Sequence, residues 1–203
     1  LTALRNPHAR VRLAAGVARG GKVTASVSGV SLSVSLTSPS LGAYTLMPAG
    51  RAAPEVAVGG HAVDTSLRDF DGGSDFTLAV MGDPDGADNP VHARLAPDRN
   101  LLPSSAYRAR LRLLHMAPEL EGRAQVSLTK DLVVVTSDPF FANPNLYAPA
   151  DAGDTAARLV ASSPDFSDGP FFDEDVVIVG RGVYSLFVMT GAERPVGLLS
   201  RER

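Results

Sequence analysis

The sequence contains no cysteine and no long apolar run, and it carries no excess of positive charge. Without cysteine the chain cannot form a disulfide, a cysteine-ligated zinc or iron–sulfur site, or a thiol nucleophile. Its apolar runs, such as 132–135 and 176–179, are far shorter than the ~20 residues that a membrane-spanning helix needs. The net charge is −3, so the chain as a whole lacks the positive field that attracts nucleic acid. We therefore expect no transmembrane segment and no nucleic-acid partner.

Sequence motifs of enzymes are also missing. The chain has no G-x-S-x-G, no P-loop and no dinucleotide-binding fingerprint. The letters of S-x-x-K occur at 127–130, but they span a strand end and its turn, whereas that chemistry needs the lysine one helical turn after the serine. The histidines have no metal-binding spacing, and we expect His115 to bond backbone at a strand end rather than act as a ligand. We expect no enzyme and no required cofactor.

The sequence is instead rich in turn residues and contains a repeat. It has 19 glycines and 15 prolines, and its short apolar runs end at Gly, Pro, Asp or Asn, as in β-sandwiches. The segment Ala9–Leu13 (ARVRL) recurs as Ala109–Leu113 (ARLRL), and Phe76–Met81 resembles Tyr184–Met189 in the same order. We predict an all-β chain of two tandem antiparallel immunoglobulin-like β-sandwich domains. Their expected bounds are 1–98 and 107–203, with a linker at 99–106.

Arginines alternate with apolar residues in the first strand of each predicted domain. Arg108, Arg110 and Arg112 share one face of the second copy, as Arg10 and Arg12 do in the first. Such a row of guanidinium groups can hold carboxylates or phosphates of a protein partner or an acidic polysaccharide. The alternative is a solvated face that prevents edge-to-edge aggregation. The first interpretation makes the three arginines of the second copy candidate partner-binding residues.

Two predicted loops of the second copy are rich in aromatic residues. Phe140, Phe141 and Tyr147 lie in one loop, and Phe171 and Phe172 lie in the other. Loops seldom expose so much aromatic surface without a function. These rings either close the domain junction or the end of the sandwich, or they form a binding hot spot for a protein partner.

Acidic residues gather in loops that precede equivalent strands of the two copies. The first loop contains Asp69, Asp71 and Asp75, and the second contains Asp165 and Asp168. Carboxylates beside glycine can bind calcium, which takes six or more oxygen ligands. Neither loop matches a calcium-loop template, and Asp-Gly pairs are ordinary turn formers. Calcium binding is therefore the alternative to turn chemistry, and a hydrolase that uses these carboxylates is a further one.

Three segments of the second copy resemble a known family. Ala109–Pro118, Val183–Gly191 and the segment 194–199 are similar to a bacterial family of extracytoplasmic β-sandwich domains of unknown function. More distantly, the layout resembles the periplasmic accessory proteins of alginate O-acetylation. The first copy departs from the pattern at 14–19, where the His-x-x-Pro feature is missing, and the second carries an aromatic insertion at 140–144. The resemblance implies an exported protein without catalytic activity.

These observations favour a non-catalytic exported scaffold or interaction protein. We expect it to dock onto a partner protein or a membrane-associated assembly through its loops and strand faces. The alternative is a binding or accessory module for an acidic polysaccharide. The expected location is extracytoplasmic: periplasm, cell surface, secreted or an organelle lumen.

Overall fold

The computed structural model describes residues 6–118, 120, 124–128, 135–137, 147–163 and 166–203. Regular secondary structure in these residues is β-strand, apart from the short 3-10 turn η1 (Ala18–Gly20), so the prediction of an all-β fold is confirmed. No helix of the described ranges has the length and apolar character needed to cross a membrane. The chain divides into two compact units, which we call unit 1 (Leu1–Arg99) and unit 2 (Asn100–Arg203).

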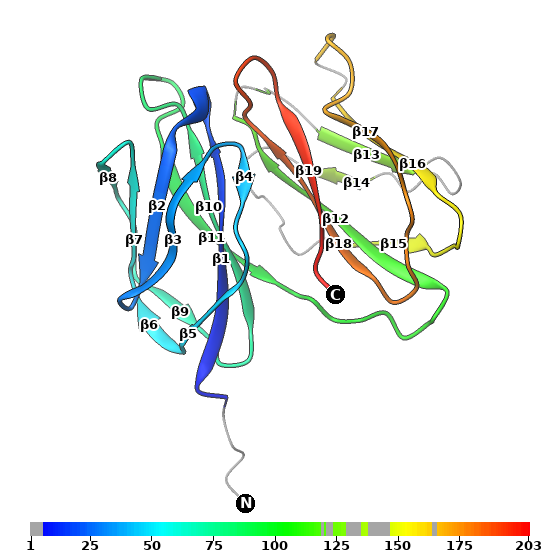
Figure 1. The fold of residues 1–203 in the computed structure, drawn as a ribbon, viewed down its shortest axis with the longest axis horizontal. Helices are drawn as coiled ribbons and strands as arrows, with labels where there is room; N and C mark the ends of the chain where they lie inside the picture. The colour runs from blue at the N-terminus through cyan, green and yellow to red at the C-terminus, as the bar shows by residue number, and fades with distance from the viewer. Residues whose placement is uncertain (1–5, 119, 121–123, 129–134, 138–146, 164–165) are drawn as a thin grey trace, which may run out of the picture. The chain divides into compact units, whose positions relative to one another are not determined.

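Unit 1 contains strands β1 to β11, coloured blue to green in Figure 1. One sheet has the order β11-β10-β1-β4, with β5 also paired to β1; a second has the order β3-β2-β7-β8, and β6 pairs with β9. The strands are β1 (His8–Val17), β2 (Lys22–Val27), β3 (Val30–Thr37), β4 (Ser40–Leu41), β5 (Thr45–Pro48), β6 (Gly50–Ala52), β7 (Pro54–Val58), β8 (His61–Val63), β9 (Arg68–Phe70), β10 (Asp75–Gly82) and β11 (His92–Asp98).

Unit 2 contains strands β12 to β19 and repeats the strand order of unit 1. Its sheets have the orders β15-β12-β18-β19 and β14-β13-β16-β17. The first of these matches β5-β1-β10-β11 of unit 1. The strands are β12 (Arg108–Met116), β13 (Ala124–Leu128), β14 (Val135–Ser137), β15 (Ala148–Asp151), β16 (Ala157–Ser162), β17 (Phe172–Val176), β18 (Val183–Met189) and β19 (Val196–Arg201).

The central pair of the first sheet is parallel in each unit, whereas the other strand pairs of the described sheets are antiparallel. β1 pairs with β10, which places Arg10 opposite Asp75, and β12 pairs with β18, which places Arg110 opposite Val183. A parallel pair needs a long crossover, and here almost the whole unit separates the two strands in sequence. Side chains alternate with a period of two in both kinds of pair, so the sequence pattern predicts strands without their direction.

Alternation along the first strand builds the core of each unit. The apolar residues of β1, Ala9, Val11 and Leu13, are buried in one hydrophobic cluster together with the apolar face of β10. The corresponding residues of β12 are buried in the cluster of unit 2. Full burial of one large aliphatic side chain contributes about 1.5–3 kcal/mol. This face of the strand is the one that the alternating pattern predicts to be internal.

A glycine contact fixes the start of the first strand in each unit. A Cβ atom on Gly72 would lie 1.8 Å from the carbonyl oxygen of Asn6, and one on Gly180 would lie 1.9 Å from that of Ala106. Only a residue without a side chain allows the backbone to approach so closely. The turn before β10 or β18 therefore packs directly on the residues that lead into β1 or β12.

Candidate functional site

A buried arginine lies at the same place in the central parallel pair of each unit. Arg12 and Arg112 are 2% and 0% exposed, respectively. The Nε–H of Arg12 donates to Oγ1 of Thr77 at 2.9 Å, and the Nε–H of Arg112 donates to Oγ of Ser185 at 2.7 Å. Each arginine is thus bonded to a hydroxyl of the neighbouring parallel strand. A buried guanidinium needs such partners, because leaving its donors unsatisfied is costly.

A tyrosine ring packs against these arginines in both units. The guanidinium carbons of Arg12 and Arg10 lie 4.6 and 5.1 Å from the ring centre of Tyr44. Arg112 lies 5.1 Å from the ring centre of Tyr147. All three distances are within the range of a cation–π interaction. The network is therefore duplicated along with the sheet that carries it.

In unit 1 the network ends on a buried carboxylate. Oδ2 of Asp98 accepts hydrogen bonds from the hydroxyls of Thr77 at 2.7 Å and Tyr44 at 2.8 Å. Asp98 is 6% exposed. The carboxylate thus compensates the charge of Arg12 through Thr77, which lies between them.

Two predicted partner-binding residues are corrected by this arrangement. Arg112 was expected on an outward face, but it is fully buried and bonded to Ser185. Tyr147 was expected in an exposed loop, but its ring lies against Arg112 and is partly buried. The alternating pattern identifies the face of a strand, yet it does not say what covers that face. Within unit 2 the two side chains therefore contact each other, and Arg112 is bonded to the neighbouring strand.

The two units differ one position earlier in the first strand. In unit 1, Nε and Nη2 of Arg10 donate to the two carboxylate oxygens of Asp75 at 2.7 and 2.6 Å. In unit 2 the residue opposite Arg110 is Val183, which has no acceptor on its side chain. Arg110 is partly buried, and its side chain makes no hydrogen bond, ion pair or ring contact to the described residues of unit 2. Unit 2 therefore has an arginine at this position of its first strand but no acidic residue opposite it on the parallel strand.

Arginines are concentrated at the same end of unit 2. We call this end the arginine end and define it by Arg108, Arg110, Arg181, Arg201 and Arg203. Backbone hydrogen bonds hold its segments together: the N–H of Arg181 donates to Arg108 O at 2.7 Å, that of Arg110 to Gly182 O at 2.9 Å, and that of Val183 to Arg203 O at 3.2 Å. Strands β12 and β19 and the turn before β18 thus bring the five arginines to one end of one sheet.

Two carboxylates lie at the arginine end. Arg108 forms an ion pair with Asp151, and both side chains are about half exposed. Glu202 lies between Arg201 and Arg203, and its N–H donates to Val183 O at 2.7 Å. Counted on side chains alone, five arginines against two carboxylates leave three positive charges in excess.

The equivalent end of unit 1 is neutral. Strand register aligns the five positions of the arginine end with His8, Arg10, Gly73, Pro97 and Arg99. Among these residues and the strand residues beside them, the acidic side chains are Asp75 and Asp98, so the two arginines are matched by two carboxylates. The excess charge of unit 2 is therefore not a requirement of the fold.

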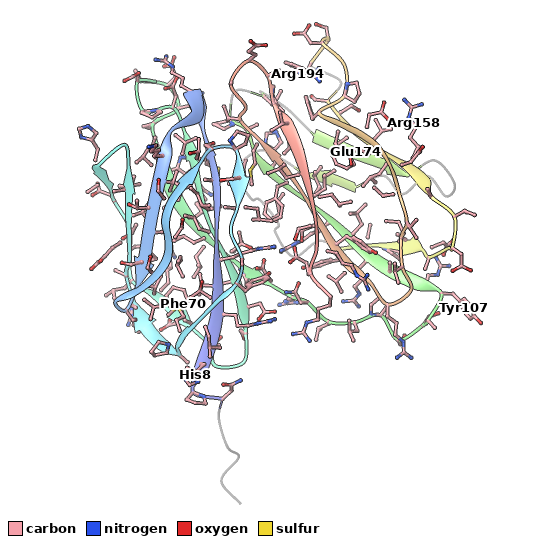
Figure 2. The ribbon with its side chains drawn as sticks, in the orientation of Figure 1. His8, Phe70, Tyr107, Arg158, Glu174 and Arg194 are labelled. Carbon is pink, nitrogen blue, oxygen red and sulfur yellow. The ribbon has the colours of Figure 1, made fainter. Side chains whose placement is uncertain are left out.

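Exposed apolar residues lie beside the arginine end. Tyr107 is 82% exposed, and its carbonyl oxygen accepts the N–H of Ala152 at 3.0 Å. Figure 2 shows the ring pointing away from the ribbon. Val177 and Val179, in the connection between β17 and β18, are 48% and 39% exposed. Tyrosine and arginine together are typical of binding hot spots.

Phe171 and Phe172 do not form an exposed docking surface. Phe171 and Phe172 are 6% and 8% exposed and belong to the core of unit 2. The Phe171 ring packs against that of Phe166 with centres 5.3 Å apart. These rings therefore fill the interior of the sandwich, which was the alternative interpretation. Phe140 and Phe141 lie outside the described residues.

The acidic residues proposed for calcium are not arranged as one ligand set. Asp75 has both oxygens bonded to Arg10. Asp69 is 77% exposed and 4.0 Å from Arg51. Among the described side chains, no group of three from His, Cys, Asp and Glu is placed to hold a metal ion. Asp71 is exposed and lines a hollow of about 910 Å³ together with Asp69. Asp168 is also exposed, and Asp165 lies outside the described residues.

Two further groups bear on the hydrolase alternative. The pKa of Asp173 is lowered, chiefly because it accepts hydrogen bonds from the Arg158 guanidinium, and a general acid needs a raised pKa. His115 lies in the core, where Nδ1 accepts the N–H of Ala117 at 3.4 Å. Burial lowers the pKa of His115 to about 4. Neither group is prepared for proton transfer at neutral pH.

Most of the arginine end is not predicted by the alternating arginine pattern of the sequence. That pattern includes Arg108 and Arg110 but not Tyr107, Arg181 or the arginines near residue 203. A position-by-position comparison of the two copies identifies Arg181 and Arg201, which stand where the first copy has Gly73 and Pro97. Arg203 aligns with an arginine of the first copy, Arg99, and is not identified in this way. No protein-family model matches the chain, and no curated protein matches it.

Proposed function

We propose that the chain is a non-catalytic interaction protein that docks onto an acidic segment of a partner protein through the arginine end of unit 2. The observation that carries this proposal is the excess of three positive charges at an end that is neutral in unit 1. Because both ends belong to the same fold, stability alone does not require the additional arginines. Charge complementarity then gives a carboxylate-rich partner both orientation and a fast association rate.

The exposed Tyr107 supports a protein partner over a polysaccharide. Its ring offers a rigid apolar contact beside Arg108 and Arg181, and this combination is enriched in protein interfaces. An acidic polysaccharide is the competing ligand, because arginines bind uronate carboxylates by the same bidentate hydrogen bonds. An extracytoplasmic location belongs to the same proposal and rests on the family resemblance; fractionation of the source cells tests it.

The test uses poly-L-glutamate and polygalacturonate as labelled probes for the two ligand classes. We expect poly-L-glutamate to bind more tightly, and its affinity to fall as salt is added, because the contact is electrostatic. The double variant R181E/R201E should weaken binding by about tenfold or more. The matched control is R51E/R68E, which changes the net charge equally on exposed arginines of unit 1.

Three outcomes would count against the proposal. Equal weakening by the control pair would show that only net charge matters. Tighter binding of polygalacturonate would favour the polysaccharide alternative. Absence of binding to either probe at low salt would remove the arginine end as a binding site.

A further inference from the structure

We propose that Arg110 binds a carboxylate of the partner, as Arg10 binds the carboxylate of Asp75 in unit 1. This inference rests on the proposed function, and it assigns one contact within the arginine end. Unit 1 supplies the template for that contact. There the carboxylate lies opposite the arginine on the neighbouring parallel strand and accepts two hydrogen bonds from it.

The geometry of the template is reproduced in unit 2 except for the acid. Arg10 and Arg110 both lie two residues before the buried arginine of their strand, and each faces the first residue of the neighbouring parallel strand. The backbone N–H of each donates to the residue before that one, Ser74 O at 3.0 Å in unit 1 and Gly182 O at 2.9 Å in unit 2. The two arginine side chains therefore leave the sheet at equivalent points.

The surroundings of Arg110 favour an external carboxylate. Its cross-strand neighbours are Pro149 on β15 and Val183 on β18, and neither side chain has a hydrogen-bond acceptor. The nearest acid on β15, Asp151, is paired with Arg108. Apolar neighbours reduce the local screening by water, which strengthens an ion pair once it forms. A partner carboxylate is thus the group that completes the arrangement seen in unit 1.

A carboxylate matches the Arg110 guanidinium better than an anion that offers a single acceptor atom. The guanidinium presents parallel N–H donors that fit the two oxygens of one carboxylate. Asp75 demonstrates this bidentate arrangement on the same sheet. Phosphate oxygens also fit the guanidinium, so inorganic phosphate serves as a competitor in the test.

The decisive variant restores the missing acid from within the chain. Val183→Asp places a carboxylate opposite Arg110, where it should form the intramolecular pair and displace the partner. We expect the affinity for poly-L-glutamate to fall by about tenfold. The asparagine of Val183→Asn has the shape of aspartate without its charge. The affinity of this variant for poly-L-glutamate should stay within about twofold of that of the parent chain. The melting temperature of V183D should be no lower than that of V183N, because its new carboxylate is paired.

The outcomes separate this inference from the proposed function. If R181E/R201E loses binding while V183D and V183N bind alike, the arginine end stands and the Arg110 contact is wrong. If all of these variants bind like the parent, both proposals fail. If V183D does not fold, Arg110→Gln replaces it, and a loss no greater than that of Arg68→Gln overturns the inference. Inorganic phosphate that displaces poly-L-glutamate at equal carboxylate and phosphate concentrations would assign the position to phosphate instead.

Discussion

Arg10 and Asp75 face each other across the parallel strands β1 and β10, and the guanidinium of Arg10 donates to both oxygens of the Asp75 carboxylate. The carboxylate is 5% exposed, whereas the arginine is 41% exposed. The pair therefore lies at the edge of the interior, where one partner has given up most of its hydration. Its counterpart in unit 2, Arg110 with Val183, lacks the acid. In unit 1 the charge of this arginine is therefore compensated within the sheet, whereas in unit 2 the residue opposite the arginine carries no charge.

Asp75→Asn should destabilise unit 1 by about 2 kcal/mol, because it removes a charged acceptor from two hydrogen bonds and leaves Arg10 without its acid. Urea unfolding of the whole chain measures the change as a shift of the unit 1 transition. Asp69→Asn is the control, since Asp69 is exposed and 4.0 Å from Arg51, and an exposed pair contributes no more than about 0.5 kcal/mol. If both variants lower the free energy of unfolding equally, the Arg10–Asp75 pair stabilises unit 1 no more than an exposed ion pair does.

The core of each unit was predictable from the sequence, whereas the covering of the other sheet face was not. Alternation places Val11 and Leu111 inside and the neighbouring arginines on the opposite face, because a strand has only two faces. The same pattern cannot show that Arg12 and Arg112 are buried. Their partners are hydroxyls and tyrosine rings that come from distant parts of the chain.

The candidate site was predictable only in part, for a related reason. Arg108 and Arg110 belong to a visible row, but Arg181 and Arg203 reach the same end through strand pairing. For Phe171 the sequence left two possibilities, closing the end of the sandwich or forming a binding hot spot, and packing against Phe166 places the ring in the core. The local sequence indicates which interactions a side chain can make, and the pairing of distant strands determines which residues it contacts.

Gly180→Ala and Gly72→Ala should each destabilise their own unit by more than about 2 kcal/mol, because the new methyl group would overlap a carbonyl oxygen of the backbone. The matched control is Gly153→Ala. No atom lies within 4 Å of a Cβ at that position, so this change should alter the free energy of unfolding by less than about 1 kcal/mol. Thermal unfolding monitored by circular dichroism measures all three variants. A neutral effect at Gly180 would show that the segment before β12 is free to move away.

Calcium should leave the melting temperature of the parent chain unchanged. Asp75 is already bonded to Arg10 through both oxygens, and calcium needs six or more oxygen ligands. A ligand that binds the folded state would raise the melting temperature in proportion to its occupancy. A rise of the melting temperature with calcium that is absent in D69N/D71N would contradict this expectation. It would indicate that the first acidic loop binds calcium. Magnesium at the same ionic strength controls for a general salt effect.

His115 should make unit 2 less stable in acid. Burial lowers its pKa to about 4 in the folded state, whereas the pKa of an unfolded histidine is about 6.5. Between these values the unfolded chain binds a proton and the folded chain does not, so the stability that is fully present above pH 6.5 falls as the pH decreases towards 4. A difference of this size corresponds to about 3 kcal/mol once the pH is below both values.

The structural cause of this dependence is the position of the ring. His115 is 1% exposed, and its Nε2 has no hydrogen-bond partner among the described residues. A proton added there would place an uncompensated charge in the core. His115→Gln stays neutral at every pH, so the difference in unfolding free energy between pH 7 and pH 4 should be smaller than in the parent chain by about 3 kcal/mol. His61→Gln, on the exposed strand β8, controls for the loss of a histidine. If H115Q and H61Q keep the same acid sensitivity, the instability comes from carboxylates, and His115 is accessible to water at low pH.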